Sequence, residues 1–95
     1  MDKVVHFEIP ADNVERAEEF YKKIFGWEIT RFPGMKYTIL RSTPIGENQM
    51  PKELGAINGG MLQRKEPIIN PVITINVSNI DSYAKNIEKS GGKVV

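Results

Sequence analysis

A strand followed by a helix occurs twice in this chain, and this internal repeat constrains the fold more than any other feature of the sequence. The segment "VVHFEI", residues 4–9, alternates between apolar and polar side chains, and so does "VITINV", residues 72–77. Alternation with a period of two is typical of a strand that buries one face. Apolar residues at helical spacing follow each strand, up to about residue 25 and from about residue 80. We therefore expect two related strand–helix units.

The two faces of each expected strand differ in chemistry. In the first strand Val5, Phe7 and Ile9 alternate with Val4, His6 and Glu8, and in the second Ile73, Ile75 and Val77 alternate with Val72, Thr74 and Asn76. The apolar sets are expected to pack against the helices, because amphipathic helices need an apolar surface to cover. The polar sets then face the other side of the sheet, where two paired units would enclose a cleft. We expect function to lie in that cleft.

The first unit contains a helix and three further strands. Asp12 with Glu15 three residues later predicts a helix start, and Gly26 predicts its end. The segments "WEITRF" and "KYTILR", separated by a Pro-Gly turn signal, predict a hairpin, and "AINGGMLQR" predicts a further strand. Within that strand, Gly59 and Gly60 indicate a bulge or a close approach of another backbone or a ligand.

The remaining segments divide the chain. Residues 42–55 are rich in polar residues, proline and glycine, so we expect a loop that acts as a lid over the cleft. Two prolines mark residues 65–71 as a linker. A second helix is then expected, capped by Asn79 or Asp81 and ended by "SGG", with "KVV" beginning another strand. We predict an α+β fold in one domain: module 1 at 1–64, the linker, and a truncated module 2 at 72–95.

Charge and composition narrow the classes of partner. The 95 residues contain 13 Lys and Arg and 12 Asp and Glu, a net charge of +1, so no strong field favours nucleic acid or an anionic membrane. No apolar stretch approaches the ~20 residues of a membrane span. The chain has no cysteine, which excludes disulfides, thiolate nucleophiles and zinc–thiolate sites. We expect a cytoplasmic protein whose partner is a small molecule, with no nucleic-acid or membrane role.

The segments "VVHFEIPADNVERAEEFYKKIFGW" and "VITINVSNIDSYAKNIEKSGGKVV" resemble the vicinal oxygen chelate (VOC) superfamily, which includes glyoxalase I, extradiol dioxygenases, methylmalonyl-CoA epimerase and bleomycin resistance proteins. The most specific pieces are the spacing from His6 to Arg16 and Phe20–Tyr21, the helix exit "FGW" and the late "SGG". The resemblance implies paired βαβββ modules, the glyoxalase/bleomycin resistance/dioxygenase-like fold, around a metal or ligand cleft. The second module is incomplete in this chain.

The resemblance also implies positions for metal ligands. His6 matches the ligand position on the first strand of metal-dependent members. The second ligand, commonly Glu, would lie in "AINGGML", which offers only Asn58; the third would open the second module, where Val72 or Thr74 stands. The fourth would lie beyond Val95. The resemblance therefore implies one metal ligand, His6, and leaves open a divalent metal such as zinc, nickel, iron or manganese.

Seven residues are candidates for the cleft: His6, Glu8, Trp27, Tyr37, Asn58, Thr74 and Asn76. Glu8 is the candidate catalytic residue, as a general base beside a carbonyl. Trp27, Tyr37 and Phe32 are candidate aromatic walls. The alternative for His6 and Glu8 is an ordinary hydrogen-bonded or solvated strand face, and the alternative for the aromatic residues is packing of the hairpin.

Three hypotheses for function follow. The first is a metal-poor member that binds or sequesters a small molecule, as bleomycin resistance proteins do. The second is a metal-dependent enzyme, a glyoxalase-like lyase, an isomerase or a dioxygenase, in which the metal stabilises an enolate-like charge. The third is an assembly domain completed by a partner chain, because an unfinished second sheet would leave an exposed edge. For this reason we also expect a homodimer or a longer parent protein.

Overall fold

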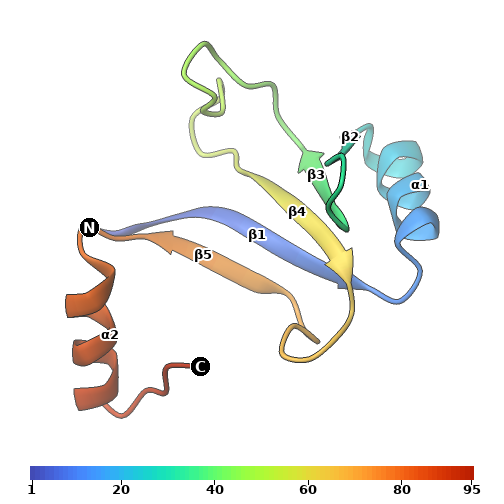
Figure 1. Ribbon diagram of the computed structural model, residues 1–95. Helices are drawn as coiled ribbons and strands as arrows, with labels where there is room; N and C mark the ends of the chain where they lie inside the picture. The colour runs from blue at the N-terminus through green and yellow to red at the C-terminus, as the bar shows by residue number, and fades with distance from the viewer.

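The computed structural model describes residues 1–95 and contains a single five-stranded sheet with two helices (Figure 1). The elements in chain order are β1 (Lys3–Ala11), α1 (Val14–Phe25), β2 (Glu28–Arg31), β3 (Tyr37–Arg41), β4 (Asn58–Gln63), β5 (Val72–Asn76) and α2 (Ile80–Lys89). The predicted α+β class is confirmed. Neither helix has the length and apolar character needed to cross a membrane.

The strands are ordered β2-β3-β4-β1-β5 in the sheet. Strands β1 and β4 are parallel, and the other neighbouring pairs are antiparallel. The first five elements form a βαβββ unit, and β5 with α2 begins the same order again. Because β5 pairs directly with β1, the start of the repeat extends the sheet of the first unit.

The register separates the residues of the sheet into two faces, since directly opposed residues project to the same side. Phe7 opposes Gly59 and Ile73, whereas His6 opposes Asn58 and Thr74. We call the face that carries His6 the open face and the other the helix face. Figure 1 shows α1 and α2 at opposite ends of the sheet.

A register shift in β1 changes one predicted face. The pairing of β1 with β5 is irregular between Val4 and His6, which leaves Val5 as an extra residue. Val4 opposes Ile75, which alternates with Thr74 and so lies on the helix face. The prediction that Val4 shares the face of His6 is therefore wrong, because strict alternation does not survive the inserted residue.

The core lies between α1 and the sheet. Leu40 and Met61 are fully buried, and Ala11 completes the buried apolar cluster. Partly buried residues pack around it, among them Phe7, Ile9, Val14, Ala17, Tyr21, Trp27 and Ile29. Aromatic and aliphatic side chains of β1, α1 and β2 thus cover the helix face, as the alternation of Phe7 and Ile9 predicts.

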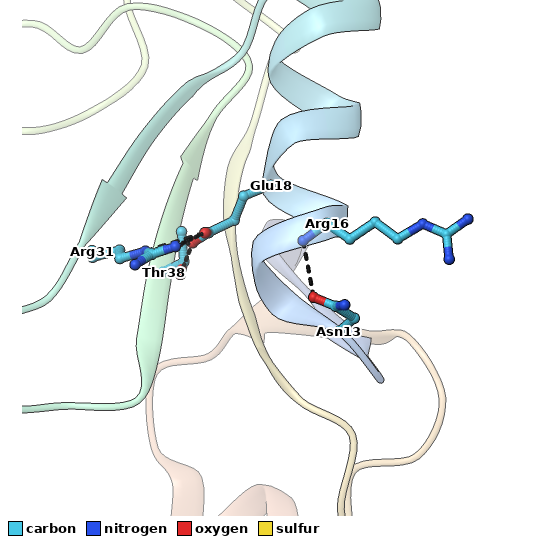
Figure 2. A network of polar contacts seen from close by, with 5 residues as sticks. All are labelled: Asn13, Arg16, Glu18, Arg31 and Thr38. Carbon is cyan, nitrogen blue, oxygen red and sulfur yellow. Dashed lines mark hydrogen bonds and ion pairs between the residues drawn. The ribbon is translucent and has the colours of Figure 1, made fainter.

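An ion pair between a buried carboxylate and an exposed guanidinium holds α1 to the hairpin of β2 and β3 (Figure 2). Glu18 is 5% exposed, and its carboxylate accepts hydrogen bonds from Arg31 Nη2 at 2.7 Å and from Thr38 Oγ1 at 2.5 Å. Burial favours the neutral acid, but the hydrogen bonds from Arg31 and Thr38 and the charge of Arg31 outweigh it, so the pKa of Glu18 falls below its ordinary 4.5. The carboxylate therefore stays ionised at neutral pH.

Helix α1 begins one residue later than predicted. Its N-cap is Asn13, whose Oδ1 accepts a hydrogen bond from the Arg16 amide at 3.1 Å (Figure 2). Asp12, the predicted cap, instead forms an ion pair with Arg64 at 2.9 Å. Asn and Asp both cap helices well. The Asp12 carboxylate is engaged by Arg64, and Asn13 provides the cap instead. Gly26 ends the helix with φ of 70°, as expected.

The second strand–helix unit is much less buried than the first. All five residues of β5 are exposed, and α2 has no buried residue. Asn79 is its N-cap, one of the two residues predicted. The expected strand at 93–95 is not formed; Lys93 and Val94 instead line an apolar groove of about 630 Å³ beside β5 and α2. Without a neighbouring strand to pair with, this segment has no hydrogen-bonding partner that would hold it extended.

Candidate functional site

Three polar side chains meet on the open face of the sheet. His6 Nε2 lies 2.9 Å from Glu8 Oε1 and 3.0 Å from Tyr37 Oη, and Tyr37 Oη donates to Glu8 Oε1 at 2.9 Å. His6 and Glu8 are alternate residues of β1, so they project side by side. Tyr37 stands at the start of β3 and reaches them across β4.

A glycine in β4 makes this contact possible. An ideal Cβ placed on Gly60 would lie 1.8 Å from Tyr37 Oη, so any side chain there would displace the phenol. A Cβ on Gly59 would lie 2.5 Å from both the ring and the carbonyl oxygen of Phe7 on the helix face. The predicted close approach of another backbone is present at Gly59, whereas the group that approaches Gly60 is a side chain. The alternative, a bulge, is absent, because β4 pairs with both neighbours without a register shift.

The protonation of Tyr37 follows from its surroundings. Burial, the hydrogen bond to Glu8 and the negative charge of Glu8 all raise the pKa of Tyr37 well above its ordinary value of 10.0. The phenol is therefore neutral and acts as a donor. When Glu8 is ionised its oxygens only accept, so His6 Nε2 is the donor in this contact. Glu8 Oε2 is buried and makes no hydrogen bond within the chain.

A cavity of about 280 Å³ opens beside this triad. Its walls are His6, Phe32, Tyr37, Ile39, Arg41, Ile45, Gln49, Asn58 and Gly59. These residues come from β1, β3, β4, the turn after β2 and the 42–55 loop. The cavity is therefore bounded by the open face on one side and by the loop on another.

The structure brings four of the seven candidate residues together. His6, Tyr37 and Asn58 line the cavity, and Glu8 contacts the first two. Thr74 is the cross-strand neighbour of His6 on β5. Asn76, which is opposite Lys3, lies on the same face but further along the strand and does not line the cavity.

Trp27 lies elsewhere. Its ring stacks on Tyr21 with a centroid separation of 4.9 Å and an interplanar angle of 11°. The centroids of the Trp27 and Phe7 rings are 5.9 Å apart. These neighbours belong to the core against the helix face. Trp27 is therefore corrected from a cleft residue to a core residue, because the helix exit at Gly26 places it beneath α1.

Several cavity residues were not among the sequence candidates. Arg41 and Ile39 follow Tyr37 at every second position of β3, so alternation along this strand predicts that all three share one face. Ile45 and Gln49 come from the loop, whose conformation has no periodic signal. Gln49 has φ of 63°, in the left-handed region that is uncommon for residues other than glycine.

The donors present on this chain do not fit a metal centre. No group of three or more His, Asp, Glu or Cys side chains lies close enough to hold a metal ion. His6 and Glu8 supply one imidazole and one carboxylate, and they bond to each other and to Tyr37. A catalytic zinc site normally has three protein ligands, so these residues alone fall short of the set.

Comparison with known proteins agrees with the fold. The family described as Bleomycin resistance protein-like N-terminal matches residues 3–42. This segment runs from β1 through β3 and includes the triad and Arg41. No curated protein matches the chain. Over residues 3–42 the chain is therefore similar to the bleomycin resistance-like proteins of the vicinal oxygen chelate superfamily, in agreement with the resemblance seen in the sequence.

Proposed function

We propose that this protein binds a small molecule in the cavity between the open face and the 42–55 loop. The observation that carries the proposal is the combination of aromatic, aliphatic and polar walls around one cavity of about 280 Å³. Small-molecule sites are typically concave and largely apolar, with a few placed polar groups that fix orientation. The family match supports the proposal, because the resemblance to bleomycin resistance proteins implies a ligand cleft on this face.

The His6–Glu8–Tyr37 triad gives the site a fixed polar wall. Each of the three side chains contacts the other two, so their orientations are set before a ligand arrives. Such pre-organisation reduces the entropy lost on binding. The proposed role of the triad is to orient and recognise a ligand, and the chemistry assigned to it requires no metal.

The loop is proposed as the second wall and lid of the cavity. Its first residues are pinned to β4, because Asn58 Oδ1 accepts hydrogen bonds from the amides of Ser42 and Thr43 at 2.9 and 3.1 Å. Ile45 and Gln49, further along, line the cavity. The loop therefore has a fixed base and a distal part that can close over a ligand.

The proposal is tested by a fragment screen observed through the amide NMR signals of the protein. We expect some fragments to shift the signals of Tyr37, Ile39 and Asn58 together. An Ile45→Trp variant fills the cavity from the loop side and should abolish these shifts. Leu54→Trp makes the same chemical change at a fully exposed position of the same loop and should preserve them. Fragments that perturb only the groove beside α2 would refute the proposal.

A further inference from the structure

We infer that the ligand of this cavity is a small carboxylate whose anionic group is bound by Arg41. The inference rests on the proposed function and names the chemical class of the ligand. Arg41 is the last residue of β3 and lines the cavity beside Ile39 and Asn58. Among the nine residues that line the cavity, none is an Asp or Glu. Arg41 is thus the only wall residue with a permanent charge.

The guanidinium of Arg41 has no partner within the chain. The ion pairs of the structure join Glu8 to His6, Glu18 to Arg31 and Asp12 to Arg64. Glu28, which opposes Arg41 on β2, forms no ion pair with it. A guanidinium binds a carboxylate through two parallel hydrogen bonds, and a partly enclosed site strengthens this attraction relative to open water.

Asn58 supplies a second donor, the NH₂ group of its side chain. The hydrogen bonds of Asn58 show which end of the side-chain amide this group occupies. Both partners of its side-chain oxygen are backbone amides, those of Ser42 and Thr43, so this end of the amide must be the acceptor. The other end is therefore the NH₂ group, which makes no hydrogen bond within the chain and belongs to a cavity-lining residue. A positive charge and an amide donor together favour an anionic oxygen ligand.

The remaining walls indicate the body of the ligand. Phe32, Ile39, Ile45 and the ring of Tyr37 present aromatic and aliphatic surface around the same cavity. A carboxylate attached to an aromatic or branched apolar body would bury that body against them while its charged end meets Arg41. The modest volume, about 280 Å³, restricts such a ligand to small molecules.

The test compares 2-naphthoate with its neutral isostere 2-naphthamide, each titrated into the full chain and followed by amide NMR. We expect naphthoate to shift the signals of Arg41, Ile39 and Asn58 and to bind at least 10-fold more tightly than naphthamide. Arg41→Met keeps an unbranched apolar stem but removes the charged guanidinium, so it should reduce naphthoate affinity at least 10-fold while leaving naphthamide binding unchanged. Arg41→Lys keeps the charge but loses the paired N–H donors of the guanidinium, so its naphthoate affinity should lie between those of the wild type and Arg41→Met.

Arg16→Met is the matched control, because it removes the same charge from a side chain that extends away from the sheet (Figure 2). It should leave naphthoate affinity unchanged, and circular dichroism should show that all variants are folded. Equal binding of both probes, or naphthoate affinity unaffected by Arg41→Met, would overturn the carboxylate inference and leave the cavity as a binding site. If neither probe shifts the cavity signals the inference also fails, and a silent fragment screen would then remove the proposed function as well.

Discussion

Tyr37 donates a hydrogen bond to Glu8 over 2.9 Å, although 29 positions separate the two residues in the chain. The bond spans β4 and joins β3 to β1 on the open face. Glu8 Oε1 also lies 2.9 Å from His6 Nε2, so two neighbours share one carboxylate oxygen. Hydrogen bonds to a charged acceptor are stronger than those between neutral groups. The same contact therefore both stabilises the sheet and fixes the side chains at the cavity wall.

Tyr37→Phe should destabilise the fold by about 1–2 kcal/mol, because it leaves a mostly buried carboxylate with one donor fewer. Urea denaturation followed by circular dichroism measures the loss. Tyr83→Phe is the matched control, since it removes a phenol bonded to the exposed carboxylate of Asp2. Water replaces that bond, so the control should cost much less; equal losses in the two variants would contradict the special role of Tyr37.

The raised pKa of Tyr37 predicts a specific response to alkali. The folded state holds this proton more tightly than the unfolded state, so the stabilisation is complete below the ordinary pKa of 10.0 and is lost as the pH rises through the higher folded value. In an alkaline titration of tyrosinate absorbance, Tyr37 should ionise only above 10.0. The hydrogen bond to Asp2 also raises the pKa of Tyr83, so the titration is carried out in a Tyr83→Phe background. Adding Tyr37→Phe to that background should remove the remaining late step, and a titration that keeps it would contradict the assignment to Tyr37.

Glu18→Gln should destabilise the protein by about 1–3 kcal/mol at neutral pH, because it removes the buried carboxylate that binds Arg31 and Thr38. We place the value below that of a fully buried pair, since the Arg31 side chain is 63% exposed and water screens it. The measurement is chemical denaturation of both proteins across a range of pH.

The pH dependence of this loss has a definite sign. The pKa of Glu18 is lowered on folding, so its stabilisation is present above the ordinary 4.5 and disappears as the pH falls through the folded value. The difference between wild type and Glu18→Gln should therefore shrink in acid. Glu19→Gln, at the exposed next residue of α1, should show little loss at any pH. A constant difference across the range would exclude ionisation of Glu18 as the cause.

Gly60→Ala should destabilise the sheet by about 1–3 kcal/mol, because the added methyl group would occupy the position of the Tyr37 phenol. The loss should be smaller in a Tyr37→Ala background, where the space is open, and a double-mutant cycle of unfolding free energies measures this coupling. Gly46→Ala, whose nearest contacts would be 3.7 Å away, should change stability by less than about 0.5 kcal/mol. Additive losses at Gly60 and Tyr37 would contradict the steric explanation.

The sequence predicted the strands and helices well because their signals are local. Alternation located β1 and β5, and Gly26 marked the end of α1. The choice of Asn13 over Asp12 as the cap depended on Arg64, 52 residues from Asp12, and no local pattern contains that contact. The extra residue at Val5 likewise arises from pairing with a distant strand.

The residues of the candidate site that lie on strands could be predicted from the alternation along each strand. His6, Glu8 and Tyr37 came from alternation and aromatic character, and Arg41 follows from the same alternation along β3. Trp27 was misplaced because its side of the sheet depends on the packing of α1. Ile45 and Gln49 lie in a loop with no periodic signal. The homodimer stays a prediction.

At the adjacent glycines of β4, no side chain separates the β4 backbone from the aromatic rings that pack on its two faces. At Gly59 the Phe7 ring presses on the main chain from the core, and at Gly60 the Tyr37 phenol presses on it from the cavity. Only backbone separates the two aromatic rings at adjacent positions. A change in packing around Phe7 can therefore shift the backbone of β4 and, with it, the Tyr37 side chain at the cavity wall. Substitutions in the core can thus alter binding without any contact with the ligand.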